Sequence, residues 1–514
     1  MSLANFLSII ICLPLFAASV SAQVIQNADT RTETEHAQKP KRYINPLPIE
    51  SAGRLADPAV VRFGEKYYLY LTGGLAWSSE DLAEWEYHPV EMPEGVRITA
   101  PGAFVHQGYV YLTGNYAGLY RSQNPLGPFE FYGDFMDAKG QRLERGSCEG
   151  CNNGGVFDPM IFVDDDGRVY LYYAGRSVNG IYGVELDREN LTKILGPVHH
   201  FFKFDPSHVW ERYGNHNENV STSWVEGPWM TKHNGTYYLQ YVAPGTDMPT
   251  YAIGVYTGKS PLGPFTYYEG SPIIADRGGL INGTGHHSVI EAKDGTVWAI
   301  YTLLYRNWNR MFERRIGMDP VSFDADGNMF INGPTEIPQW APGVVAEPWR
   351  NNDSGVIPVT EDKNYEVSSE APGRDAAYAI DRNVRTWWAP APGDDAPSMT
   401  LDLASATTMD PIQTYVIDSA RILFTLPSGL RREGEAARNR QYKIEVSTTG
   451  DEFTMVVDKT QNTLDNAVDF DEIEPIQCRF VRLTLTGWPE GLPVGVLEFT
   501  VFGEPGTAFP PLQD

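Results

Sequence analysis

The chain has 514 residues, with 66 Asp and Glu against 40 Lys and Arg, so its formal net charge is −26 at pH 7. With 42% hydrophobic and 12% aromatic residues it can bury more than one core, which excludes a disordered chain and predicts two or more domains. The acidic balance excludes a nucleic-acid partner, because affinity for phosphate backbones comes from clustered Lys and Arg. The 49 Gly and 37 Pro favour many short strands over a helical bundle.

The first 22 residues are typical of a secretory signal. The apolar run at residues 7–20 has the length of a signal core and is too short to span a bilayer. Ser21 and Ala22 are small residues of the kind that a signal peptidase prefers, although no Lys or Arg precedes the run. We therefore expect a secreted or periplasmic protein. No later segment predicts a membrane partner.

Three cysteines remain once Cys12 leaves with the signal. Cys148 and Cys151 form an isolated C-x-x-C motif, and no second Cys/His pair follows at zinc-finger spacing, which disfavours a structural zinc site. In an oxidising compartment we expect a small disulfide between these two residues, with a functional thiol as the alternative. We expect Cys478 to be buried and inert.

A turn followed by an aromatic-rich strand recurs five times, and an apolar stretch precedes each turn. The turn glycines are Gly64, Gly108, Gly167, Gly235 and Gly295. Asp-Gly and Asn-Gly between apolar runs are typical of hairpins with type I′ turns. Repeats of this size, with about four short strands each, are what a propeller blade requires. The pattern predicts a five-bladed β-propeller.

Beyond Pro342 and Gly343 the turn pattern stops, and alternating apolar and polar residues predict a β-sandwich of the jelly-roll type. Its expected strands begin near Ser398, Ala420, Tyr442, Arg479 and Val496. The whole chain is therefore expected to be all-β. The expected segments are a signal peptide at 1–22, a linker at 23–44, the propeller at 45–345, a linker at 346–354, the sandwich at 355–505 and a tail at 506–514.

The innermost strand of each blade begins near the propeller axis, so residues at this register converge although they are far apart in sequence. Three of the five equivalent positions carry a carboxylate, one a histidine and one only an alanine: Asp57, Asp158, Glu226, His286 and Ala100. Acids crowded at an axis lose hydration and repel one another, which keeps one protonated near neutral pH while another stays ionised. This split is what glycoside cleavage needs. The alternative, Asp57 and Asp158 as turn caps before proline, explains neither Glu226 nor His286.

Four motifs occur at these positions: Ala-Asp-Pro at Asp57, Phe-Asp-Pro at Asp158, Glu-Gly-Pro-Trp at Glu226 and Gly-x-Gly-His at His286. In combination they resemble glycoside hydrolase family 43 over the whole expected propeller. The resemblance implies that Asp57 is the general base that activates water and Glu226 the general acid. It also implies that Asp158 tunes and orients the acid, that the reaction is a single displacement with inversion, and that catalysis requires no cofactor.

Further site residues follow from the same resemblance. His286 matches the family's axial histidine, and Arg314 or Arg315 falls where the family places a sugar-contacting arginine. Three tryptophans are candidates for stacking on a sugar ring, although core packing is the favoured use of each: Trp77, Trp224 and Trp229.

The C-terminal segment resembles the discoidin or factor 5/8 type C fold, which includes carbohydrate-binding module family 32. The matching stretches begin at Ala379, Leu401, Tyr442, Arg479 and Glu498. The resemblance implies that a structural calcium ion is bound by Asp381, Thr386 and Glu498, since hard oxygen donors suit calcium. The pattern departs at Arg382, where a glycine is usual.

Together these features predict a secreted, inverting exo-glycosidase that releases β-xylosyl or α-L-arabinofuranosyl units from plant or algal polysaccharide fragments. The sandwich would hold the enzyme near its polymer, and no obligate protein partner is expected. One alternative is a galactose- or anhydrogalactose-releasing hydrolase. Another is a glycan-binding protein without catalysis, which the presence of all three carboxylates disfavours.

Overall fold

The computed structural model describes residues 39–50, 55–137, 139–140, 142–143, 156–175, 177–275, 278–308, 311–404, 414–425 and 437–506. The signal segment and the first three cysteines lie outside these ranges, so export and the Cys148–Cys151 disulfide stay predictions. Cys478 is a free, buried thiol, as expected. None of the helices in the described ranges combines the length and the hydropathy of a bilayer span.

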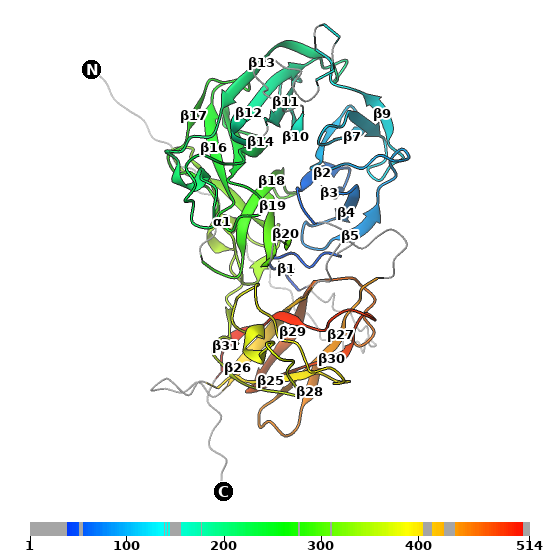
Figure 1. The fold of residues 1–514 in the computed structure, drawn as a ribbon, viewed down its shortest axis with the longest axis vertical. Coiled ribbons are helices and arrows are strands. Elements are labelled where there is room, and N and C mark those ends of the chain that lie inside the picture. Colours follow the sequence, from blue (N-terminus) through cyan, green and yellow to red (C-terminus); the bar gives the residue numbers. More distant parts are fainter. Residues whose placement is uncertain are drawn as a thin grey trace, which may run out of the picture. The chain divides into compact units, whose positions relative to one another are not determined.

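Five antiparallel sheets of four strands, each with its strands in chain order, surround a common centre (Figure 1), which confirms the predicted propeller. Blade one contains β2 (Ala59–Phe63), β3 (Lys66–Leu71), β4 (Leu75–Ser79) and β5 (Glu86–Pro89). Blade two contains β6 (Gly102–His106), β7 (Tyr109–Thr113), β8 (Leu119–Ser122) and β9 (Glu130–Gly133). Blade three contains β10 (Phe157–Val163), β11 (Val169–Ala174), β12 (Ile181–Leu186) and β13 (Ile194–Phe202).

Blade four contains β14 (Glu226–His233), β15 (Thr236–Ala243), β16 (Ala252–Gly258) and β17 (Phe265–Tyr267). Blade five contains β18 (Asn282–Glu291), β19 (Val297–Trp308), β20 (Met311–Phe323) and β21 (Met329–Ile331). Two short strands, β1 (Arg42–Tyr43) and β22 (Gln339–Trp340), pair with each other. One short helical turn, η1 (Ser177–Asn179), joins β11 to β12 in blade three, and a second, η2 (Val209–Glu211), lies between blades three and four.

The hairpin turns follow the type I′ prediction only in part. Asn234 and Gly235 both have positive φ, 48° and 72°, as a type I′ turn requires. At the Asp166-Gly167 pair only Gly167 has a positive φ, 78°, and the loop runs from Val163 to Val169. The prediction is therefore wrong for this pair, because a longer loop needs only one left-handed residue.

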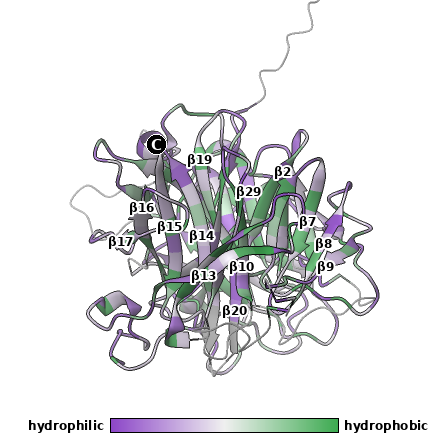
Figure 2. Ribbon diagram, turned by 90° about the horizontal axis from the view of Figure 1, so that it is seen from above, coloured by the Kyte–Doolittle hydropathy of each residue, from purple (hydrophilic) through white to green (hydrophobic). Residues whose placement is uncertain are grey.

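The ring closes by packing between blade one and blade five. Trp77 and Leu69 of blade one share a buried cluster with Trp298, Ile300 and Met318 of blade five. Figure 2 shows hydrophobic residues along strands such as β2 and β7, with many hydrophilic residues in the loops. Apolar faces between neighbouring sheets thus form the core of the propeller.

The C-terminal segment is a sandwich of two antiparallel sheets, as predicted. One sheet has the order β23 (Ile357–Pro358), β31 (Val496–Pro505), β26 (Tyr415–Phe424) and β29 (Val468–Cys478). The other has the order β24 (Asn364–Val367), β25 (Ser398–Asp402), β30 (Phe480–Gly487), β27 (Gln441–Ser447) and β28 (Thr454–Asp458). Two short helices, α1 (Pro348–Asn351) and η3 (Ala376–Ala379), precede the core strands.

The propeller and the sandwich belong to one compact unit that begins at Pro40. Arg42 donates to Asp418 at 2.8 Å and to Glu472 at 2.9 Å. The buried Arg421 of β26 donates to the backbone carbonyls of Asn45, at 2.8 Å, and Glu336, at 3.0 Å. Two buried guanidinium groups bound in this way fix the sandwich against the propeller, because hydrogen bonds to charged groups are stronger than neutral ones.

Candidate active site

A left-handed residue lies near the start of the inner strand of every blade. The φ angles are 58° at Asp57, 47° at Ala100, 48° at Asp158, 54° at Gly227 and 34° at His286. Positive φ is costly for residues other than glycine, and such strain gathers at functional sites. In blade four the residue with this conformation is Gly227, and the predicted Glu226 directly precedes it.

Asp57 is held by three groups from different parts of the chain. The hydroxyl of Thr72 donates to Oδ2 of Asp57 at 2.5 Å, and Nη1 of Arg314 donates to Oδ1 at 2.7 Å. The backbone N–H of Asp57 donates to the hydroxyl of Thr302 at 2.9 Å. Only 6% of the residue is exposed, so its carboxylate exchanges most of its water for this charged and polar surround.

Asp158, Glu226 and His286 complete the cluster. The N–H of Gly227, directly after Glu226, donates to Oδ2 of Asp158 at 3.1 Å. Nδ1 of His286 lies 3.5 Å from Oδ1 of Asp57 and 3.6 Å from Oδ2 of Asp158. All three carboxylates are buried. The structure therefore brings together the three acids and the histidine that the sequence singled out.

The fold shifts the pKa values of Asp57 and Glu226 in opposite directions. Burial raises the pKa of Asp57, but the positive charges of Arg314 and His286 and the Thr72 hydroxyl outweigh it, so the net pKa lies below its usual value. Burial, followed by the charges of Asp158 and Asp57, raises the pKa of Glu226 well above its usual value. One carboxyl is thereby suited to accept a proton and the other to donate one.

The pKa of Asp158 is raised, but less strongly than that of Glu226. Burial raises its pKa, the charge of His286 lowers it, and Asp57 raises it again, with a net increase. Its own charge is among the causes that raise the pKa of Glu226. Asp158 therefore helps to keep Glu226 protonated, and its contact with the N–H of Gly227 fixes the backbone beside that acid.

The two candidate arginines lie in different surroundings. Arg314 contacts Asp57 and also donates to the hydroxyl of Thr246 at 3.0 Å. Arg315 is 5% exposed, and its guanidinium lies over the ring of Tyr305, 4.7 Å from the centroid. Of the two arginines it is Arg314 that lies at the carboxylates, because adjacent residues of a strand point to opposite faces.

The three candidate tryptophans differ in their surroundings. Trp77 is fully buried in the cluster between blades one and five, so the prediction that it stacks on a sugar is wrong. Trp229 packs against the core between blades three and four. Trp224 is half-buried and lies two residues before Glu226. Gly245 lies between its ring and Asp247: a methyl group added at Gly245 would be 3.2 Å from the ring of Trp224 and 3.3 Å from the Asp247 carboxylate. Of the three, only Trp224 stays a candidate for a sugar contact.

A hydrogen-bonded link connects the site to the sandwich. The hydroxyl of Tyr305, on β19, reaches the backbone carbonyls of Phe424, at 2.8 Å, and Ala467, at 2.9 Å, both in the sandwich. The ring of Tyr305 supports Arg315, which is the chain neighbour of Arg314. The sandwich thereby helps to position the arginine that keeps Asp57 ionised.

Sequence reasoning missed several residues of the site. Thr72 follows strand β3 and Asp247 lies in the loop after β15, where no motif marks them. Asp247 adds to the charges that raise the pKa of Glu226. Tyr251 is fully buried, and burial, followed by the charges of the three carboxylates, raises the pKa of its hydroxyl well above the usual value. The only signal for Thr72 and Asp247 in the sequence was their position after the second strand of a blade. In an antiparallel pair the end of the second strand lies beside the start of the first, where the acids are.

The residues linked by resemblance to calcium lie together in the sandwich. The hydroxyl of Thr386 donates to Oδ2 of Asp381 at 2.7 Å. Burial raises the pKa of Glu498 to about 8, and the charge of Asp381 adds to the rise. Arg382, at the usual glycine position, has a φ of 54°, donates its N–H to Glu498 at 3.0 Å, and pairs through its guanidinium with Glu336 of the propeller. The oxygen donors fit calcium chemistry, although the described ranges hold no cluster of three or more His, Cys, Asp or Glu ligands.

We expect Glu226→Gln to stabilise the fold at neutral pH. Because the pKa of Glu226 is raised in the fold, the folded chain holds this proton more tightly than the unfolded chain, and stability falls as pH rises above the ordinary glutamate value. Glutamine removes this titration, so Tm at neutral pH should rise by roughly 2–4 °C. The gain should vanish in acid, where the wild-type carboxyl is protonated in both states.

Asp57→Asn provides the opposite control. The pKa of Asp57 is lowered in the fold, so its stabilising charge is present above the ordinary aspartate value and is lost as pH falls through the folded value. Asparagine removes the charge that Arg314 contacts, and Tm at neutral pH should fall. Thermal unfolding between about pH 3 and about pH 8 measures both variants. Shifts of the same sign in both would contradict these protonation states.

Comparison with known proteins places this geometry in a family. The model of glycosyl hydrolases family 43 matches residues 45–329, more than half of the chain, and that of a NedA-like, galactose-binding domain matches residues 378–483. A beta-D-galactofuranosidase of Aspergillus niger is 26% identical over 305 residues, which are 54% of this chain and 82% of the relative. A beta-xylosidase of Xylanibacter ruminicola is 26% identical over 248 residues, 43% of this chain and 68% of the relative.

Among solved structures, a thermostable family-43 glycoside hydrolase is 27% identical, with a TM-score of 0.49, over 58% of this chain and 99% of its own. The family model spans all five inner-strand starts, from Asp57 to His286. The chain therefore belongs to glycosyl hydrolases family 43 and is a glycoside hydrolase.

Proposed function

We propose that this enzyme is an inverting exo-glycosidase that releases β-xylosyl or α-L-arabinofuranosyl units from plant or algal polysaccharide fragments. The observation that carries the proposal is the opposite displacement of two carboxyl pKa values, at Asp57 and Glu226, within one buried cluster. Inversion by single displacement requires an ionised base and a protonated acid at the same time. Relatives named beta-xylosidase and xylosidase/arabinosidase support a pentose as the released sugar.

In the proposed reaction Asp57 takes a proton from a water molecule while the water oxygen bonds to the anomeric carbon. The bond from that carbon to the glycosidic oxygen breaks, and Glu226 gives its proton to the leaving oxygen. The reaction ends with Asp57 protonated and Glu226 ionised, and exchange with solvent restores both. Arg314 opposes early protonation of Asp57, and Asp158 keeps the proton on Glu226 until the leaving oxygen becomes basic.

A galactose-type substrate is the second candidate. It is favoured by one observation, the match to a beta-D-galactofuranosidase over 54% of the chain. Galactofuranose and arabinofuranose both present a five-membered ring, so one pocket shape admits either, and the loops around it select between them. A purely glycan-binding role is disfavoured because binding alone has no need for three buried acids, whose desolvation is costly.

The function is tested with nitrophenyl glycosides of xylose, arabinofuranose and galactofuranose, followed by NMR of the first product formed. We expect hydrolysis of at least one pentoside and a product whose anomeric configuration is inverted. Hydrolysis of the galactofuranoside alone would favour the second candidate. Retention of configuration, or binding of glycans without hydrolysis of any, would overturn the proposal.

Glu226→Ala should lose more activity on substrates with poor leaving groups than on activated aryl glycosides. Protonation of the leaving oxygen matters most when that oxygen is basic, and general-acid help is worth about 100- to 10,000-fold. The measurement compares kcat/KM of the variant and the wild type on an alkyl and a nitrophenyl glycoside. Equal losses on both would contradict the assignment of Glu226 as the acid.

Tyr305→Phe should move the acid limb of the kcat/KM profile to higher pH. Loss of its bonds to the sandwich loosens Arg315 and thereby Arg314, so the pKa of Asp57 rises and the base is protonated sooner. We expect kcat/KM to fall at least about threefold on the acid side. Tyr70→Phe is the matched control, since the buried Tyr70 of blade one donates to the carbonyl of Pro125 in blade two at 2.7 Å. An unmoved limb in Tyr305→Phe, or an equal shift in Tyr70→Phe, would contradict the link.

Calcium in the sandwich is a further part of the proposal, with a structural role only. Asp381, Thr386 and Glu498 would hold the ion through oxygen atoms. Calcium chloride should then raise Tm of the wild type and not that of Asp381→Asn, with magnesium chloride as the ionic control. A Tm that ignores calcium, or rises equally in the variant, would contradict it.

A further inference from the structure

The hydroxyl of Tyr251 is a buried polar group that has no hydrogen-bond partner among the described residues. Tyr251 ends the loop after β15, and its backbone N–H donates to the carbonyl of Met248 at 3.1 Å. The same loop is tied to blade five, because the N–H of Gly283 donates to the carbonyl of Pro249 at 2.9 Å. A buried donor without a partner is costly, so the position of this hydroxyl needs a reason.

The phenol ring of Tyr251 lies against the start of β18. A Cβ added at Gly285 would be 2.8 Å from Cζ of Tyr251, the ring atom that carries the hydroxyl. Only glycine fits there, which explains the second glycine of the Gly-x-Gly-His motif. The next residue is His286, whose Nδ1 lies 3.5 Å from Oδ1 of Asp57. The hydroxyl end of Tyr251 is therefore packed beside the carboxylate cluster.

The charges of the site act on this hydroxyl. Burial raises its pKa well above the usual value, the charges of Glu226, Asp158 and Asp57 add to the rise in that order, and Arg314 opposes it. Glu226 in turn is acted on by Asp158, Asp57 and Arg314, and by Asp247. Tyr251 thus keeps its proton and remains a donor while the carboxyls around it titrate.

We propose that Tyr251 is a positioning residue for the general acid, and that its hydroxyl donates a hydrogen bond to the Glu226 carboxylate once Glu226 has given up its proton. The inference rests on the proposed function, in which Glu226 protonates the leaving oxygen. The hydroxyl oxygen is closed off from solvent, so its partner is a side chain of the protein rather than the substrate. Of the carboxylates around it, Glu226 acts on it most strongly.

Such a bond strengthens as the reaction proceeds. The proton of Glu226 passes to the leaving oxygen, while the hydroxyl of Tyr251 keeps its own proton and turns about its C–O bond to face the new carboxylate. A hydrogen bond to a charged oxygen is roughly twice as strong as one to a neutral oxygen. The contact therefore stabilises the transition state more than the ground state, which is what lowers a barrier.

Tyr170→Phe is the matched control for Tyr251→Phe. Tyr170, on β11, is also fully buried, with a hydroxyl that has no partner in the described ranges. The charges that act on Tyr170 come from Glu185 and from residues 164–168, not from the three carboxylates of the site. Both substitutions remove an unpartnered hydroxyl, so neither should lower Tm at a pH where Glu226 is protonated.

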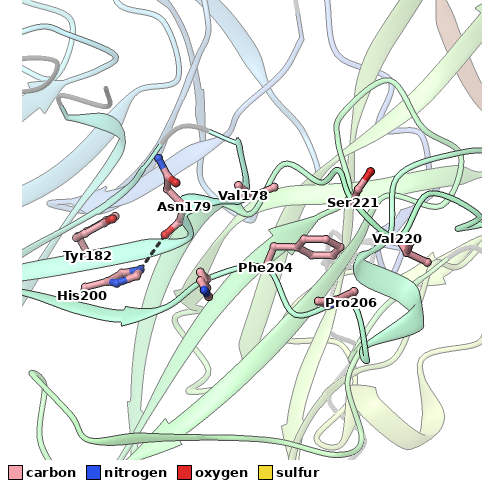
Figure 3. A pocket seen from close by; sticks show the side chains of 9 residues that line it. Val178, Asn179, Tyr182, His200, Phe204, Pro206, Val220 and Ser221 are labelled. Carbon is pink, nitrogen blue, oxygen red and sulfur yellow. Dashed lines mark hydrogen bonds between the residues drawn. The ribbon is translucent and has the colours of Figure 1, made fainter. Parts of the chain in front are cut away.

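A second control disturbs the loop that leads to Glu226 without changing Tyr251. A recess of about 500 Å³ lies over the outer strands of blade three, and its lining includes Val178, Phe204 and Val220 but none of the three carboxylates (Figure 3). Val220 is 57% exposed, so Val220→Trp adds an indole at the surface of this loop. It should leave the pH profile of the enzyme unchanged.

The test is the pH dependence of kcat/KM on an alkyl and a nitrophenyl glycoside. Loss of the donor raises the pKa of Glu226, so in Tyr251→Phe the basic limb should move to higher pH by about one unit. At the plateau we expect a loss of about tenfold on the alkyl glycoside and a smaller loss on the nitrophenyl glycoside. Both controls should keep the wild-type profile.

Carbon-13 NMR of the Glu226 carboxyl provides a readout that needs no activity, and its titration should move to higher pH in Tyr251→Phe alone. An unmoved titration and basic limb in Tyr251→Phe would overturn the proposal. So would an equal shift in either control, or a Tm well below that of Tyr170→Phe, which would mean a structural role. If the wild type cleaves no glycoside, the proposed function fails, while the titration still decides whether Tyr251 bonds to Glu226.

Discussion

The ion pair between Asp57 and Arg314 is the interaction on which the rest of the site depends. Three buried carboxylates next to one another cannot all carry charge without a large cost, so the fold must decide which one ionises. Arg314 makes that decision, because it contacts Asp57 at 2.7 Å, whereas Glu226 receives the charges of the other two acids. The proton acceptor is thus set by the position of one guanidinium group, and the proton donor by burial together with the charges of the other two acids.

That position is determined partly outside the propeller. Arg315, the neighbour of Arg314, rests on Tyr305, whose hydroxyl is bound to carbonyls of the sandwich. The sequence alone suggested that the sandwich only holds the enzyme near its polymer. The structure gives the sandwich a second role, which is to support the arginine of the site. Arg382 adds to this attachment, since its left-handed backbone keeps the conformation of the expected glycine while its guanidinium reaches Glu336.

The sequence predicted what repetition encodes. Five copies of one hairpin pattern were enough for the propeller, and their common register was enough to find Asp57, Asp158, Glu226 and His286. The sequence did not show that the left-handed residue is Asp158 in blade three but Gly227, directly after Glu226, in blade four, because both inner strands have the same register shift. The sequence also could not decide whether Trp77 stacks on a sugar or packs in the core, because burial of an aromatic side chain depends on the neighbouring blade, which local sequence does not describe.

The central claim concerns protonation, so carbon-13 NMR of the Asp57 and Glu226 carboxyl groups tests it most directly, with each signal assigned by the corresponding amide variant. The account predicts that Glu226 releases its proton at a higher pH than Asp57 in the free enzyme. Arg314→Met should bring the two titrations closer together by raising that of Asp57. If Asp57 keeps its proton to a higher pH than Glu226 in the wild type, the account is contradicted.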